Sequence, residues 1–125
     1  MPKRPKHLPP VPIVSRYGDA LRAMARHMAP KHRMMLLHHF ASPAHRTTAS
    51  QLARAVDYKD WNSVNLQYGT FAKHLADQMG WIVPAGSPAL YAICWFEMPP
   101  GARQHWRLVM HHELADAIKA LGWGT

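Results

Sequence analysis

A stripe of apolar residues in the middle of the chain constrains the fold more than any other feature of this sequence. The stripe recurs at steps of three or four residues, which is the spacing of one face of an α-helix. Its members are Trp61, Val64, Tyr68, Phe71, Leu75 and Met79. Asp60 is placed to cap the start of this helix, and Gly80 suits the left-handed residue that ends one. We therefore predict a long helix with one buried face over residues 61–79.

A shorter helix is predicted immediately before the long one. Thr48 and Gln51 have the spacing of a capping box, in which each side chain bonds the backbone N–H of the other residue. Apolar residues follow this pair, and residues 57–60 then interrupt the helical pattern. A short helix, a tight break and a longer helix form the order of a helix-turn-helix.

Two further helices are expected before the helix-turn-helix. Ser15 is placed to cap the first, in which apolar residues again recur every three or four positions. Pro30 fits the first turn of the second, because the N–H that proline lacks would have no partner there. The dipeptide at 42–43, serine followed by proline, ends that helix.

The period changes to two after Gly80, which is the pattern of β-strands. Strands are predicted over 81–83, 90–97 and 104–110, and a last helix over 112–121. Four tryptophans on these elements are expected to face the core: Trp61, Trp81, Trp106 and Trp123. We expect one α+β domain over residues 15–125, mainly helical, with a helix-turn-helix core, a β-hairpin wing and a C-terminal helix.

The positive charge of the chain is concentrated near its start. Residues 1–34 contain eight of the 15 lysines and arginines but only one of the seven acids, within a formal net charge of +8. Five of the first 14 residues are proline, so residues 1–14 are predicted to be a disordered basic arm. Such an arm suits a polyanion, because neutralising phosphates releases condensed counterions. The alternative is a solubilising tail with no partner.

The polar face of the long helix carries side chains that suit DNA bases. Amides pair with adenine edges, hydroxyls bond bases or phosphates, and an apolar group can meet a thymine methyl. The candidates are Asn62, Ser63, Leu66, Gln67, Thr70 and Lys73. Asn65 lies at the border of the apolar stripe and is expected to be a buried amide. A plain solvated helix face is the alternative, although such faces more often carry Glu and Lys.

Other candidate DNA contacts lie outside this face. Arg46, Thr48 and Lys59 lie at or near the starts of the two helices, where contacts to the DNA backbone are usual. Thr48 is explained equally well by helix capping alone. Arg103 and Arg107 belong to the predicted wing. The arm adds Lys3, Arg4 and Lys6, which are expected to contact phosphates or the minor groove.

The sequence offers little for catalysis or metal binding. No Gly-rich phosphate loop is present, and no arrangement supplies a nucleophile with a base and an orienting group, so we expect neither enzymatic activity nor a cofactor. Adjacent histidines point about 100° apart on a helix, so we expect the histidines to be exposed or half-buried and to add charge near pH 6. The single cysteine, Cys94, excludes a disulfide framework and is expected to be buried. A cytoplasmic protein follows, and no apolar run approaches the roughly 20 residues of a membrane span.

The segment TASQLARAVDYKDWNSVNLQYGTFAKHLADQMGW resembles an accessory domain found beside HNH nuclease domains in predicted bacterial restriction and defence proteins. Its most specific part is VNLQYG at residues 64–69, and the C-terminal HWRLVMHHELADAIKALGW fits as well, so the resemblance covers about residues 45–123. It implies a winged-helix-like module for DNA recognition or defence rather than cleavage. The chain has no HNH signature, so nuclease activity would need a partner. It also departs from the family in its basic arm and first two helices.

These observations predict a double-stranded DNA-binding protein, either a small regulator or a defence accessory protein. The long helix would enter the major groove, and the arm would add further contacts. The alternative is a protein-interaction module, such as an inhibitor or subunit of a nuclease or defence complex. RNA is the weakest partner, because no stacking aromatics are evident on an exposed sheet face. The sequence shows no heptad repeat that would specify an oligomer.

Overall fold

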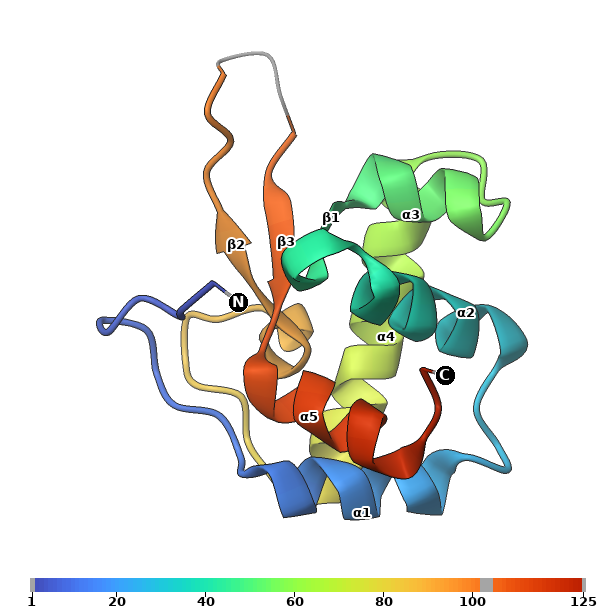
Figure 1. Ribbon diagram of the computed structural model, residues 1–125, viewed down its shortest axis with the longest axis vertical. Helices are drawn as coiled ribbons and strands as arrows, with labels where there is room; N and C mark the ends of the chain where they lie inside the picture. Colours follow the sequence, from blue (N-terminus) through green and yellow to red (C-terminus); the bar gives the residue numbers. More distant parts are fainter. Residues whose placement is uncertain (1, 102–104, 125) are drawn as a thin grey trace.

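Helices form most of the molecule, and a small antiparallel sheet packs against them (Figure 1). The computed structural model describes residues 2–101 and 105–124. The helices are α1 (Val14–Met24), α2 (Pro30–Ala41), α3 (Ala49–Ala55), α4 (Trp61–Met79) and α5 (His112–Leu121). The strands are β1 (Arg46–Thr48), β2 (Cys94–Glu97) and β3 (Arg107–Met110), with single 3-10 turns η1 (Pro43–His45) and η2 (Ala89–Ala92). The expected mainly helical α+β fold, with its helix-turn-helix, hairpin and last helix, is confirmed.

The helix-turn-helix has the helix ends that its sequence predicts. The Thr48 hydroxyl accepts a hydrogen bond from the Gln51 backbone N–H at 3.1 Å, and the Gln51 amide oxygen accepts one from the Thr48 N–H at 3.0 Å. An Asp60 carboxylate oxygen accepts a bond from the Ser63 N–H at 3.2 Å and so caps α4. Gly80 ends α4 in the left-handed region, at φ 64°. Local side-chain chemistry therefore sets both helix starts and the end of α4.

The sheet joins segments from both sides of the helix-turn-helix. Its strand order is β1-β3-β2, and both pairings are antiparallel. Leu108 of β3 lies between Thr47 of β1 and Phe96 of β2. Strand β1 was not predicted, because its three residues are too few to show an alternation. It closes one edge of the hairpin and fixes the hairpin beside α3.

Four elements differ from the predictions. Residues 81–83 form no strand, because the Trp81 N–H bonds the Ala76 carbonyl at 3.0 Å and completes the end of α4. The predicted strand at 90–97 begins as the 3-10 turn η2, and β3 begins only at Arg107. Helix α1 begins at Val14, so Ser15 lies inside the helix and does not cap it.

Two buried histidines connect elements of the core. The His39 Nε2–H donates to the Leu108 carbonyl at 3.0 Å, and the Tyr68 hydroxyl donates to His39 Nδ1 at 2.9 Å, which ties α2, α4 and β3 together. The His111 Nε2–H donates to the Tyr91 carbonyl at 2.6 Å. Burial lowers the pKa of both histidines to about 4. The expectation that the histidines add charge near pH 6 is therefore wrong for these two.

The N-terminal segment, residues 2–13, lies along the sheet instead of extending freely (Figure 1). The Arg4 guanidinium donates two hydrogen bonds of 3.1 Å to the Glu113 carboxylate. The Tyr91 hydroxyl donates to the Pro9 carbonyl. Leu8 packs in a small apolar cluster on the same side of the sheet. The prolines keep this segment free of helix and strand, but these contacts hold it against the body, in contrast to the free arm that the composition suggests.

Four single-residue expectations can be compared with the structure. Cys94 is fully buried, as predicted, and burial raises the pKa of its thiol. Trp61 and Trp106 keep 47% and 53% of their surface exposed, so neither is a core residue. Asn65 is exposed on α4 and is not the buried amide that was expected. The last three differences lie close together, at the junction of α4 and the hairpin.

Candidate nucleic-acid interface

The outward face of α4 is open to solvent over its first three turns. Asn62, Leu66, Thr70 and Lys73 are all exposed, and Leu66 keeps 67% of its surface accessible. The Asn62 amide and the Lys73 ammonium have no partner among the residues that the structure describes. The Thr70 hydroxyl donates to the Leu66 carbonyl at 2.8 Å, one turn back along the helix. An amide, an apolar side chain and a cation are thus available to a partner on one helix face.

Two other candidates on α4 are engaged within the molecule. The His32 Nε2–H lies 3.0 Å from the Gln67 amide oxygen, which turns that amide towards α2. Ser63 is half-buried, and its hydroxyl lies 3.5 Å from the Asp60 carboxylate that caps the helix. Gln67 and Ser63 therefore serve packing and capping, while the exposed Asn65 presents an amide that sequence reasoning assigned to the core.

The two arginines of the sheet share one acidic partner. Arg46 Nη2 donates to a Glu97 carboxylate oxygen at 2.9 Å, and Arg107 forms an ion pair with the same carboxylate. All three side chains are half-buried. Since two guanidinium groups meet one carboxylate, the cluster keeps one unit of positive charge. Arg46 and Arg107 are thus brought together, as a structural ion cluster with a residual attraction for phosphate.

The remaining candidates that the structure describes belong to three separate segments of the chain. Lys59 is exposed just before α4, and Thr48 is occupied by its capping bonds. Arg103 lies outside the described residues. Lys3 and Lys6 are exposed on the N-terminal segment.

Arg4 has a different position from its lysine neighbours. Its pairing with Glu113 holds it against α5, and the charged partner raises its already high pKa. In Figure 1 the N-terminal segment lies on the left of the sheet, whereas α3 and its connection to α4 lie on the right. The lysines of this segment are therefore not part of the α4 face.

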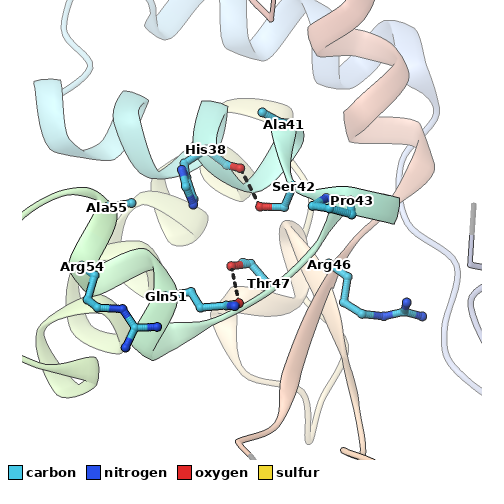
Figure 2. Close-up of a pocket in the computed structure, with 9 residues that line it drawn as sticks. All are labelled: His38, Ala41, Ser42, Pro43, Arg46, Thr47, Gln51, Arg54 and Ala55. Atoms are coloured by element: carbon cyan, nitrogen blue, oxygen red, sulfur yellow. Dashed lines mark hydrogen bonds between the residues drawn. The ribbon is translucent and has the colours of Figure 1, made fainter.

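A basic hollow of about 550 Å³ lies between the end of α2, β1 and α3 (Figure 2). Within it, the Ser42 hydroxyl donates to the His38 carbonyl at 2.8 Å and the Thr47 hydroxyl donates to Gln51 at 3.2 Å. No acidic side chain lines it, and the Arg54 guanidinium on α3 has no partner among the described residues. This hollow is an electropositive surface on the helix that precedes α4.

A second hollow, which we call the aromatic cleft, lies between the first turn of α4 and the hairpin. It measures about 460 Å³ and is lined by Ala49, Trp61, Asn65, Phe96, His105, Trp106 and Leu108. Phe96 and Leu108 are cross-strand partners, so they share one face of the hairpin. Leu108 is buried beneath the helices, but the hairpin continues beyond the point where α4 begins. The rings on that continuation are left partly uncovered.

Sequence reasoning missed the aromatic cleft because it assigned Trp61 and Trp106 to the core. The one available signal was that Trp61 is the first residue of its helix. A first residue has no preceding turn to pack beside it, so it can cover only the edge of a core. Recognising the cleft also required the register of the hairpin against α4, which depends on contacts distant in sequence.

The described residues contain no group of three or more His, Cys, Asp or Glu side chains that could hold a metal ion. No helix of the described chain is long and apolar enough to cross a membrane. Comparison with family models, curated proteins and solved structures finds no match to this chain.

Proposed function

We propose that the protein binds double-stranded DNA, with the first turns of α4 in the major groove. The observation that carries this proposal is the open amide face of the second helix of a helix-turn-helix. Asn62 and Asn65 are both exposed there, and neither has a partner among the described residues. The early turns of this helix are the part that reads base edges in such folds, and asparagine can bond adenine through two hydrogen bonds.

The surrounding charge supports the proposal. Lys59 precedes α4, Lys73 lies on its exposed face and Arg54 lies on α3, and none of these cations has a partner among the residues that the structure describes. The chain as a whole carries a net charge of +8, which favours association with a polyanion. We therefore assign phosphate contacts to these three cations and base contacts to Asn62, Asn65 and Leu66. The resemblance to HNH-associated winged-helix-like modules supports recognition as the role, with any cleavage left to a partner.

The test compares two amides on the same helix. Oligonucleotides bound by the protein are first selected from a random duplex pool, and affinities are then measured by fluorescence anisotropy. Replacing Asn62 with alanine should weaken binding to the selected sequence by about 5- to 150-fold, the value of one lost bidentate base contact. Gln78→Ala, a matched change at the exposed far end of α4, should have no effect. Equal effects of the two changes, or no retained complex at physiological salt, would reject the proposal.

A second candidate function is a protein-interaction module that binds a nuclease or another defence protein. Its support is the exposed apolar side chains of α4 and of the hairpin, among which Leu66 and Met98 keep 67% and 69% of their surface accessible. Methionine and aromatic residues are enriched in protein interfaces, and charged residues are depleted in their centres. Under this function the protein would form no DNA complex at physiological salt, so the same titration separates the two functions.

A further inference from the structure

We propose that the aromatic cleft holds one unpaired nucleobase, so that the preferred ligand is duplex DNA that carries an unpaired nucleotide. This inference rests on the proposed function, because it requires that α4 already holds the duplex. It goes beyond that function by naming the kind of DNA. Four features of the cleft favour this ligand: its rings, its polar rim, its charge and its position beside α4.

The rings of the cleft are placed as a stacking site. Trp61 comes from α4, Phe96 from β2 and Trp106 from the residue just before β3, and all three are partly exposed. The volume of about 460 Å³ lies within the range of small-molecule sites, which is about 300–1,000 Å³. Every nucleobase has a flat apolar face that stacks on such rings. A cleft with aromatic walls on two sides therefore suits a planar ring.

The rim of the cleft carries groups that can bond the edge of a base. Asn65 contributes an amide, which both donates and accepts, and His105 contributes an imidazole. Neither side chain has a partner among the described residues. An unpaired base exposes its Watson–Crick edge, which enzymes and binding proteins read with such groups. The rim therefore matches a base better than a purely aliphatic side chain of a protein partner.

The charge around the cleft favours a nucleotide as its occupant. Over the part of the chain that the structure describes, no carboxylate lines the cleft. Two acids are neighbours in sequence of the cleft residues Trp61 and Phe96. Asp60 accepts a hydrogen bond from the Ser63 N–H, and Glu97 is held between the two arginines of the sheet. The sheet cluster keeps one positive charge, and Lys59 lies two residues before Trp61. Lys59 therefore offers a cation on the α4 side of the cleft to the phosphate that accompanies a base, whereas Arg107 alternates with Leu108 and lies on the other face of the sheet.

The position of the cleft connects it to the duplex. Asn65 lines the cleft and follows Asn62 by one helical turn on α4. DNA held against the open amide face therefore lies next to the cleft entrance. A base that is already unpaired can enter without the cost of breaking a base pair, which is a few kcal/mol. The geometry thus favours DNA with an unpaired nucleotide over a fully paired duplex.

The experiment compares two duplexes with the same backbone. One has a single bulged thymidine, and the other has an abasic nucleotide at the same place, with a fully paired duplex as reference. Affinities of the full chain are measured by anisotropy. The wild type should bind the bulged base about 5- to 150-fold more tightly than the abasic bulge, the range found for one base stacked on an aromatic side chain. Trp106→Ala should remove this preference and leave the affinity for the paired duplex unchanged.

Control variants separate stacking from general damage to the hairpin. Met98→Ala removes an exposed side chain of the same hairpin outside the cleft and should keep the preference. Trp106→Phe keeps an aromatic ring in the cleft and should keep part of the preference for the bulged base. Thermal melts followed by circular dichroism verify that each variant is folded.

The outcomes that overturn the inference differ from those that overturn the proposed function. Equal wild-type affinity for the base and the abasic bulge, or an unchanged preference in Trp106→Ala, would reject the cleft as a base site while duplex binding stands. No binding to any of the three duplexes would reject the proposed function itself. Tighter binding of the same bulge in RNA would reject DNA as the ligand. A shift of tryptophan emission with a leucine-rich amphipathic peptide, and none with bulged DNA, would assign the cleft to a protein partner.

Discussion

The two faces of the hairpin differ in how completely the rest of the molecule covers them. On the outer face, Trp95 and Val109 are buried, and residues of the N-terminal segment pack over them. On the inner face, Leu108 is equally buried, but Phe96 and Trp106 extend past the start of α4 and remain open. The faces have similar apolar residues, so composition does not explain the difference. The N-terminal segment covers the outer face, whereas over the described residues the helices cover the inner face at Leu108 but leave Phe96 and Trp106 partly exposed.

The comparison indicates where the fold gains stability and where it leaves surface available. Each Å² of apolar surface removed from water contributes roughly 25 cal/mol, so covering the outer face stabilises the molecule directly. The same gain is not realised in the aromatic cleft. Exposed tryptophans that break the usual core pattern are expected at functional sites rather than at random. We therefore interpret the outer face as structural and the inner face as the binding face.

The largest expected effect is on the free energy of unfolding when a tryptophan is removed from each face. Trp95→Ala should lower the free energy of unfolding by about 3–5 kcal/mol, because it empties a buried site on the outer face. Trp106→Ala should lower it by less than about 1 kcal/mol, because half of that side chain is already in water. Urea denaturation of the two variants measures both values. Similar losses would mean that the inner rings are core residues and would remove the contrast.

The next largest effect is a dependence of protein stability on pH, which arises from His111 beneath the outer face. His111 is neutral beneath it, where Arg4 Nη1 donates to its Nδ1 at 3.0 Å. Its pKa is about 4 in the folded protein, below the usual 6.5, so the unfolded chain binds the proton first. The stability from this histidine is complete above pH 6.5 and is lost as pH falls towards 4, by roughly 3 kcal/mol.

Unfolding measured against pH tests this expectation. His111→Gln keeps a donor for the Tyr91 carbonyl but does not titrate, so its stability should fall less between pH 6.5 and 4 than that of the wild type. Parallel curves for the wild type and His111→Gln would show that His111 does not hold the outer face.

The smallest expected effect concerns the exposed lysines of the segment that covers the outer face. Replacing Lys3 and Lys6 with alanine should leave the free energy of unfolding within about 0.5 kcal/mol of the wild type, because both side chains are exposed. Because the phosphate contacts are assigned to Lys59, Lys73 and Arg54, the slope of log affinity against log salt should stay unchanged, whereas the loss of two phosphate contacts would make it shallower by about 1.8, at 0.9 for each contact. Anisotropy titrations at several salt concentrations give this slope. An unchanged slope would restrict the N-terminal segment to its structural role.

Much of the fold follows from patterns that are local in sequence. The periodic stripe of α4, its Asp60 cap and its Gly80 end are properties of neighbouring residues, and the structure reproduces all three. The last helix has the predicted bounds for the same reason. The ends of the strands were harder to predict, because a strand exists only where a partner pairs with it. Strand β1 and the absent strand at 81–83 are both errors of this kind.

The candidate site was less predictable than the fold. Asn62, Leu66 and Lys73 were placed correctly on the open face, because a helix wheel needs only the period of α4. Gln67 was assigned to the same face but bonds His32, which lies 35 residues earlier and reaches it through tertiary packing. The aromatic cleft was missed for a similar reason: whether Trp61 and Trp106 are covered depends on where α4 begins relative to the hairpin.

The central claim is that the open face of α4, rather than the cationic N-terminal third, contacts DNA. Mapping of backbone amide chemical shifts during titration with the selected duplex tests this claim residue by residue. The account predicts that the largest changes fall on residues 61–73 and on the hairpin beside them, with small changes on α1 and the N-terminal segment. Changes concentrated on residues 2–34, with none on the exposed turns of α4, would contradict it.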